Sequence, residues 1–199
     1  IVEPRLDDLV RYVDWTFFFS AWELKGKFPR ILDDPEKGAA ARQLYQDGQA
    51  LLDRILSTGA LQAQGVYGFW PAASEGDDVV LYADEGRADE AARLHFLRQQ
   101  TTQPDARPNL CLADFVAPGG NGARDHVGAF AATILGADEL AARYEAESDD
   151  YHAIMVKALA DRLAEAFAEW LHERARSDWG IEPRGRWTPD ELLDEPYPG

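Results

Sequence analysis

The sequence predicts an α+β fold with one long amphipathic helix near its C-terminal end. Residues Ser148 to Trp179 contain no Pro or Gly, and their apolar side chains recur at the three- and four-residue spacing of one helix face. A second helical pattern covers about 35–57, whereas 65–83 is rich in β-branched and aromatic residues around the turn sequence EGDD and predicts a β-hairpin. Helices mixed with short strands in this way are typical of an α+β domain.

Shorter patterns predict the remaining elements. Helices are expected over 6–13 and 137–146, and strands over 109–117 (NLCLADFVA) and 126–135 (HVGAFAATIL). The stretch 86–100 is ambiguous because its Ala-rich part has helix propensity, and we favour a strand in its C-terminal half. In the tail, Thr188 followed by a proline predicts a capped short helix from about Pro189 to Asp194.

Composition limits the classes of function. A chain of 199 residues with 46% hydrophobic content can bury the core of one domain, and we expect 1–199 to be a single domain. Its net charge of −16 argues against nucleic acid and anionic membranes as partners. One cysteine, Cys111, excludes an internal disulfide and favours a reducing compartment, so we expect a cytoplasmic protein. No apolar run approaches the roughly 20 residues needed to cross a bilayer, and the first residues lack a signal peptide pattern.

Tests for catalytic motifs are negative. PGGNGA lacks the Lys and Ser/Thr of a phosphate-binding loop, and no glycine pattern follows a strand and opens a helix as a dinucleotide site requires. The four histidines are scattered without a metal-ligand spacing, so no metal site is expected. Cys111, within an apolar stretch, is interpreted as a small buried hydrophobe. The residues by themselves therefore predict no catalytic centre.

Asp14 is the one acidic residue that the local sequence singles out. It stands at the edge of the most hydrophobic segment, directly before Trp15 and three consecutive phenylalanines. A carboxylate in such surroundings must find hydrogen-bond donors or become protonated. Two interpretations remain open: Asp14 binds a ligand, or it caps a local turn.

Five separate segments are similar to the C-terminal activation domain of cobalamin-dependent methionine synthase, and they follow one another in that family's order. These segments are YVDWTFFF (12–19), GKFPRIL (26–32), FLRQQ (96–100), CLADFVAP (111–118) and DDYHAIMVKALADRLAEAFAEWLHE (149–173). The resemblance implies a twisted antiparallel sheet flanked by helices. It also implies a domain that binds S-adenosylmethionine and supports the reductive methylation of oxidised cobalamin, which a neighbouring module of the enzyme carries.

The resemblance implies three cofactor-binding carboxylates and no catalytic residue. Asp14 matches the Asp of the family's YxDW segment, and Glu195 resembles an acid near the ammonium end of S-adenosylmethionine, where charge pairing is chemically sensible. Glu165 lies on the long predicted helix just off its apolar face and could face the ligand. Its alternative interpretation is a solvated charge array with Asp161 and Glu169.

The sequence also departs from the family pattern. The family continues into an Arg-containing segment ending in GYPACP, whose Arg binds the carboxylate of the cofactor, and the 199 residues stop immediately before it. We therefore expect a truncated activation domain that is not active alone. Position 17 is Phe where the family often has Pro. The implied partners are the cobalamin module and a flavodoxin-like electron donor; the alternative is a docking module for these partners that binds no cofactor of its own.

Overall fold

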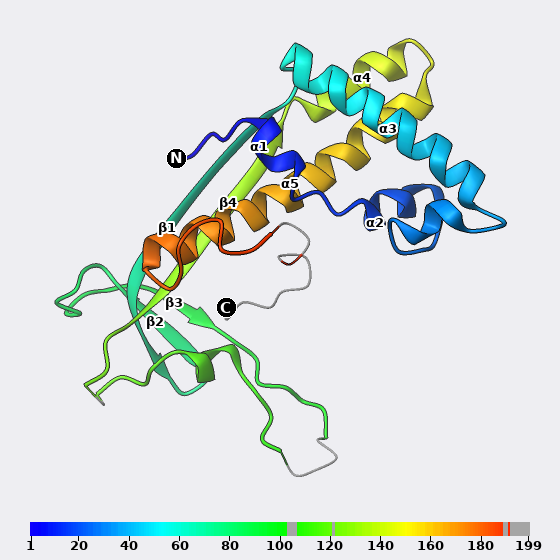
Figure 1. Cartoon of the computed structure of the whole chain (residues 1–199). Coiled ribbons are helices and arrows are strands. Elements are labelled where there is room, and N and C mark those ends of the chain that lie inside the picture. The colour runs from blue at the N-terminus through cyan, green and yellow to red at the C-terminus, as the bar shows by residue number, and fades with distance from the viewer. Residues whose placement is uncertain (103–106, 121, 189–190, 192–199) are drawn as a thin grey trace. The chain divides into compact units, whose positions relative to one another are not determined.

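The computed structural model describes residues 1–102, 107–120, 122–188 and 191. The chain forms two compact units, one made of Ile1–Val66 with Phe130–Gly199 and the other of Tyr67–Ala129. Within these described residues, four strands form an antiparallel sheet in the order β3-β2-β1-β4 (Figure 1). The predicted α+β fold with a long helix near the C-terminal end is confirmed. The assignment of 1–199 to a single domain stays a prediction.

The described elements have the following bounds. The helices are α1 (Leu6–Val10), α2 (Trp15–Phe18), α3 (Gly38–Thr58), α4 (Ala137–Ala146) and α5 (Asp150–Trp179), with 3₁₀ turns η1 (Phe19–Trp22), η2 (Arg30–Asp33) and η3 (Leu112–Phe115). The strands are β1 (Gln62–Glu75), β2 (Asp78–Tyr82), β3 (Glu90–His95) and β4 (Asp125–Leu135). Strands β1 and β4 each contribute residues to both units.

Helix α5 supports the first unit. The side chain of Asp149 accepts a hydrogen bond from the His152 amide at 3.1 Å and caps the start of the helix, and Gly180 ends it with a left-handed backbone at φ 86°. The predicted boundaries are therefore correct to within two residues. Most of the apolar face is buried, although Tyr151 and Ile154 near its start are exposed, and α1, α2, α3 and α4 all contact α5. The central side chains of this core are Met155, Leu159, Leu163, Phe167 and Leu171.

Gly48 gives α3 a close contact with the aromatic run of the first unit. A Cβ atom at this position would lie 2.7 Å from Cζ of Phe18, which is closer than a real Cβ atom approaches another carbon. Glycine weakens a helix interior. Its absent side chain nevertheless lets Phe18, which is 1% exposed, pack directly against the helix backbone.

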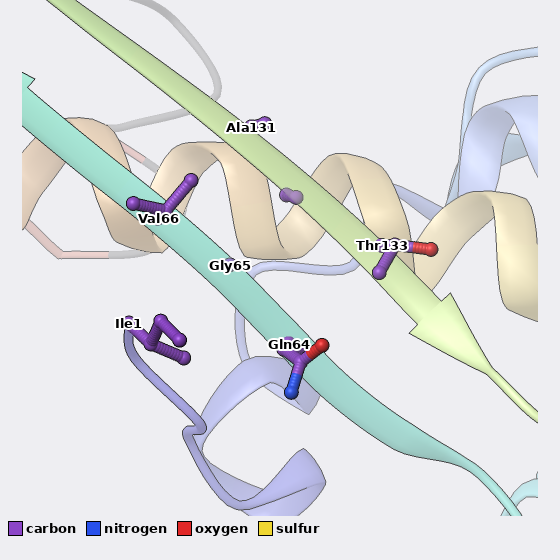
Figure 2. Close-up of a pocket in the computed structure, with 7 residues that line it drawn as sticks. Ile1, Gln64, Gly65, Val66, Ala131 and Thr133 are labelled. Atoms are coloured by element: carbon purple, nitrogen blue, oxygen red, sulfur yellow. The ribbon is translucent and has the colours of Figure 1, made fainter.

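Within the first unit, α5 covers one face of the paired strands β1 and β4. Gly65 of β1 faces Phe167 of α5, and a Cβ atom at position 65 would lie 2.8 Å from Cζ of the Phe167 ring. On its other edge β1 exchanges two backbone hydrogen bonds with Val2. A shallow hollow of about 310 Å³ lies beside Ile1, between residues of β1 and β4 (Figure 2). Its lining contains no charged side chain.

The second unit contains the predicted hairpin, and its strand β3 lies earlier in the sequence than predicted. Strands β1 and β2 pair from Ala72 opposite Leu81 to Glu75 opposite Asp78, so the EGDD sequence forms the turn as predicted. Strand β3 begins at Glu90 and ends at His95, which places it earlier than the C-terminal half of 86–100 that we favoured. The reason is long-range, because pairing with β2 and not local propensity determines where this strand lies.

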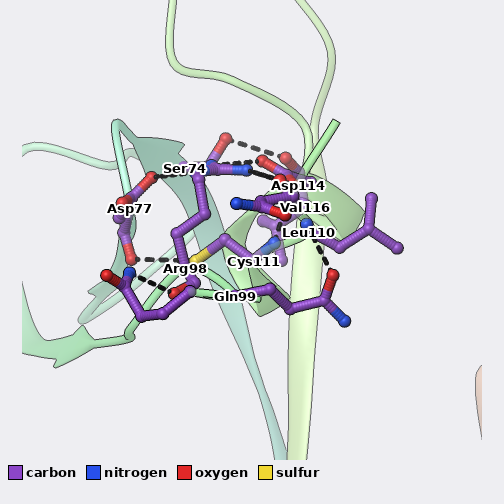
Figure 3. Close-up of polar contacts among 10 residues, drawn as sticks. Ser74, Asp77, Arg98, Gln99, Leu110, Cys111, Asp114 and Val116 are labelled. Carbon is purple, nitrogen blue, oxygen red and sulfur yellow. Dashed lines mark hydrogen bonds and ion pairs between the residues drawn. The ribbon is translucent and has the colours of Figure 1, made fainter. Parts of the chain in front are cut away.

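The strand predicted over 109–117 is wrong. Residues Leu112–Phe115 form the 3₁₀ turn η3, in which the Asp114 carboxylate accepts a hydrogen bond from the Cys111 amide at 2.9 Å. Arg98 donates two hydrogen bonds to the same carboxylate, each 2.7 Å long, and two more to Oδ1 of Asp77, at 3.0 and 2.7 Å (Figure 3). Cys111 is buried, as predicted, and its thiol donates to the carbonyl of Asp77 at 3.6 Å.

The Arg98–Asp114 contact predicts how stability depends on acidity. Hydrogen bonds from Arg98 and from the Cys111 amide lower the pKa of Asp114 from 3.8 to about 2. Because the folded-state pKa lies below the unfolded one, the stabilisation is complete above pH 3.8 and is lost as the pH falls towards 2. Asp114→Asn should therefore lower the thermal unfolding midpoint near neutral pH, with a difference from wild type that shrinks through this window. Circular dichroism melts between these pH values measure it, and a difference independent of pH would contradict the assignment.

Candidate functional site

Asp14 lies in the short connection between α1 and α2 and caps α2. Its Oδ1 atom accepts a hydrogen bond from the Thr16 amide at 2.8 Å, and the residue is half-buried. The capping interpretation of this residue is therefore confirmed. The cap occupies one carboxylate oxygen, and no other hydrogen bond to Asp14 forms within the described part of the chain. A role in binding a ligand is compatible with this geometry and stays a prediction.

Glu165 is exposed on α5 and pairs with Arg162 one turn earlier on the same helix. The Arg162 guanidinium also lies over the ring of Phe17 in α2, with 5.4 Å between its central carbon and the ring centroid. The pairing differs from the charge array with Asp161 and Glu169 that was the alternative interpretation. The structure thus connects the helix that follows Asp14 with the part of α5 that carries Glu165.

Glu195 lies outside the described residues, as does the helix predicted from Pro189 to Asp194 except for Glu191. The capping contacts predicted at Thr188 are present. Its hydroxyl accepts a hydrogen bond from the Glu191 amide at 3.3 Å, and its own amide donates to the Glu191 carboxylate at 2.8 Å. This reciprocal pattern is the capping box that opens many helices.

A buried polar network was missed by sequence reasoning. The Tyr12 hydroxyl donates to Glu173 of α5 at 2.5 Å, and the amide of Gly185 donates to the other oxygen of that carboxylate at 2.6 Å. Burial and the hydrogen bond to Glu173 raise the pKa of Tyr12 to about 12, so the phenol stays neutral. Glu173 and Tyr12 lie 161 residues apart in the sequence, so no local pattern indicates their contact.

A second buried contact joins the C-terminal tail to α5. Nε of Arg176 donates to Glu182 at 2.7 Å, and the Trp187 indole donates to the other oxygen of Glu182 at 2.8 Å. Burial acts to raise the pKa of Glu182, but the hydrogen bonds from Arg176 and Trp187 outweigh it, and the pKa lies below its ordinary value. These contacts attach tail residues 182–187 to α5.

Within residues 1–102, 107–120, 122–188 and 191, no group of three or more His, Cys, Asp or Glu side chains is arranged to hold a metal ion. His126 instead contacts the carboxylate of Glu85 at 2.7 Å. Over the same residues, no helix combines the length and apolar character needed to cross a bilayer.

The chain is an α+β domain. Its candidate ligand-binding residues Asp14 and Glu165 lie on elements that the contact between Phe17 and Arg162 joins. A family model described as "Vitamin B12 dependent methionine synthase, activation domain" matches residues 5–199. A solved structure, "Crystal Structure of the MetH Reactivation Domain bound to AdoHcy", is 48% identical and superimposes with a TM-score of 0.94. The match covers 100% of this chain and 61% of that one. The chain belongs to the activation domain family of vitamin B12-dependent methionine synthase.

Proposed function

We propose that this chain binds S-adenosylmethionine as part of a cobalamin-dependent methionine synthase, a methyltransferase, and supports the reductive methylation of oxidised cobalamin. The main support is the reactivation domain that was solved with AdoHcy bound and is 48% identical to this chain. AdoHcy is S-adenosylmethionine without the methyl group that is transferred. A surface that accepts one of the two molecules therefore meets most of the same polar groups in the other.

The described residues fit such a ligand chemically. S-adenosylmethionine carries an ammonium group and ribose hydroxyls, which are hydrogen-bond donors, and a positively charged sulfur. Asp14 and Glu165 offer carboxylate groups, which in the ionised form accept hydrogen bonds and donate none. The second oxygen of Asp14 takes no hydrogen bond from the described residues, and the Glu165 side chain is 51% exposed. Glu195 would add a third carboxylate from the tail.

The mechanism we propose is one of positioning. S-adenosylmethionine would supply a methyl group on a sulfur that is already a good leaving group, and reduced cobalamin from the neighbouring module would accept it. No proton has to be removed, so the chain needs no general base. Asp14 and Glu165 would orient the methyl donor, and holding it in reacting geometry reduces the entropic part of the barrier.

The partners are part of the same proposal. The cobalamin module of the enzyme would present its cofactor to this domain, and a flavodoxin-like protein would supply the electron for reduction. The chain by itself would not complete the reaction, since neither partner is part of it. If the chain only docks these partners through its acidic surface and binds no cofactor, it should give no heat in a calorimetric titration with S-adenosylmethionine.

Isothermal titration calorimetry with S-adenosylmethionine tests the proposal. Wild type should bind, and Asp14→Asn should weaken binding by about tenfold or more, because a hydrogen bond to a charged group is lost. Asparagine is as good an N-cap as aspartate, so the thermal midpoint of this variant should stay close to that of wild type. Asp14→Ala removes both the cap and the charge and should lower affinity and stability together.

Two results would count against the proposal. Absence of heat in wild type up to millimolar S-adenosylmethionine would favour the docking module. Wild-type affinity in Asp14→Asn would remove Asp14 from the site and leave it as a helix cap only.

A further inference from the structure

Phe17 is an unusually exposed aromatic residue in the first unit. It belongs to α2, where Trp15 and Phe18 on either side of it in the helix are buried, whereas Phe17 is 55% exposed. An exposed phenylalanine gains little from the hydrophobic effect. Among the described residues, the Phe17 ring makes one cation–π contact, with Arg162 of α5. The guanidinium carbon lies 5.4 Å from the ring centroid. The face of the Phe17 ring therefore packs against the positively charged guanidinium of Arg162.

Arg162 lies between two more exposed groups. Its side chain is only 19% exposed, compared with 51% for the Glu165 side chain with which it pairs. A guanidinium is planar and can stack on an aromatic face while its edge donates hydrogen bonds to a carboxylate. The ring of Phe17 restricts the plane of the guanidinium, and the guanidinium restricts the rotamer of Glu165.

This arrangement connects two helices that are far apart in the sequence. Phe17 lies three residues after Asp14 in the turn that Asp14 caps, and Arg162 lies one helical turn before Glu165. A movement of α2 relative to this part of α5 would have to break the contact between Phe17 and Arg162. The contact therefore couples the positions of the two carboxylates.

We propose that Phe17 and Arg162 are positioning residues that hold the Glu165 carboxylate in place for the S-adenosyl ligand, with Phe17 acting through Arg162. The inference rests on the proposed function, because it assigns Glu165 to the ligand site. Neither residue touches the reacting atoms in this scheme. Their contribution is to reduce the number of orientations that Glu165 samples before the ligand binds, which lowers the ordering cost of binding.

A double-mutant cycle between Phe17 and Glu165 tests the inference, with affinity for S-adenosylmethionine measured by calorimetry. Phe17→Leu keeps an apolar side chain in α2 and removes the ring face, and it should weaken binding by about two- to fivefold, the range of a partly exposed cation–π contact. Phe17→Tyr retains the ring and is the matched control, with affinity expected to equal that of wild type. Arg162→Lys keeps the charge without the planar group and should behave like Phe17→Leu.

The combined variant separates a positioning role from a structural one. If Phe17 acts through Glu165, then Phe17→Leu should have no further effect on affinity in a Glu165→Gln background. An equal loss in both backgrounds, or a loss that merely follows a lowered thermal midpoint, would overturn the inference. So would a wild-type affinity in Phe17→Leu.

Failure of the inference can be distinguished from failure of the proposed function. If wild type itself gives no binding, both fall. If wild type binds and Glu165→Gln has no effect, Glu165 is outside the site and the positioning role is excluded, whereas the proposed function stands. If Glu165→Gln weakens binding but Phe17→Leu does not, only the inference about Phe17 and Arg162 fails.

Discussion

Replacing Arg176 by methionine is expected to lower the free energy of unfolding by about 3–5 kcal/mol, the usual cost of leaving one partner of a buried ion pair without the other. The Arg176 and Glu182 side chains are only 4% and 3% exposed, and their contact is 2.7 Å long. Methionine has a similar length but cannot donate to Glu182, so the carboxylate would remain buried with much of its compensation lost. Equilibrium urea unfolding followed by circular dichroism measures the change.

Two further variants make this test specific. Arg174→Met, two residues earlier on α5, changes a side chain that is 31% exposed and pairs with Asp178, and it should cost less than about 1 kcal/mol. Arg176→Met combined with Glu182→Leu removes both charges and should recover part of the loss, because an apolar pair can replace a buried ion pair. A small effect of Arg176→Met alone would show that the tail does not depend on this contact.

Phe167→Ala is the second change with a large expected effect. Phe167 is fully buried in α5 and its ring lies against Gly65 of β1. Removing a buried phenylalanine ring leaves a cavity and typically costs about 3–5 kcal/mol. The same unfolding measurement tests it. Phe130→Ala is the control in the same unit, since Phe130 is 42% exposed and its truncation should cost far less.

The pairing of Gly65 with Phe167 adds a test of coupling. Gly65→Ala in wild type should destabilise by about 1–3 kcal/mol because the added Cβ overpacks the contact. In the Phe167→Ala background the ring is absent and the penalty should become smaller, although the carbonyl oxygen of Ala131 would still lie 2.9 Å from the new Cβ. Strictly additive costs would show that the two positions do not share a contact.

The elements that local patterns determine were predicted well. Helix α4 has the predicted bounds, and α5 begins at Asp150, two residues after the predicted start, because Asp149 is its N-cap. Strand β4 differs from its prediction by one residue. In these segments the apolar spacing, the caps and the terminal glycine agree with the tertiary structure, so the sequence window contains the information needed.

The errors arose where distant contacts decide the conformation. The apolar stretch 109–117 resembles a strand, yet residues 112–115 form η3. There the Asp114 carboxylate accepts hydrogen bonds from the Cys111 amide and from Arg98, which is distant in the sequence. The start of β3 depends in the same way on its pairing with β2. Neither the ion pair nor the strand register is visible in a window of a few residues.

The candidate site shows the same division. Asp14 was singled out because a carboxylate next to a hydrophobic run needs donors, and the structure supplies one from the Thr16 amide. No local pattern singled out Arg162, because its contact with the Phe17 ring joins residues that are far apart in the sequence. The ligand roles of Asp14 and Glu165 came from family resemblance and stay predictions, as does that of Glu195, which lies outside the described residues.

The division of the chain into two units also constrains the order in which the first unit can form during synthesis. Its helices α1 to α3 leave the ribosome before α5, because the whole of the second unit, Tyr67–Ala129, is translated in between. Leu9, Phe18 and Leu52 therefore remain without the α5 side chains of their shared core while these later residues are being made. The second unit is one contiguous stretch, so all of its residues have been translated before α5 is made.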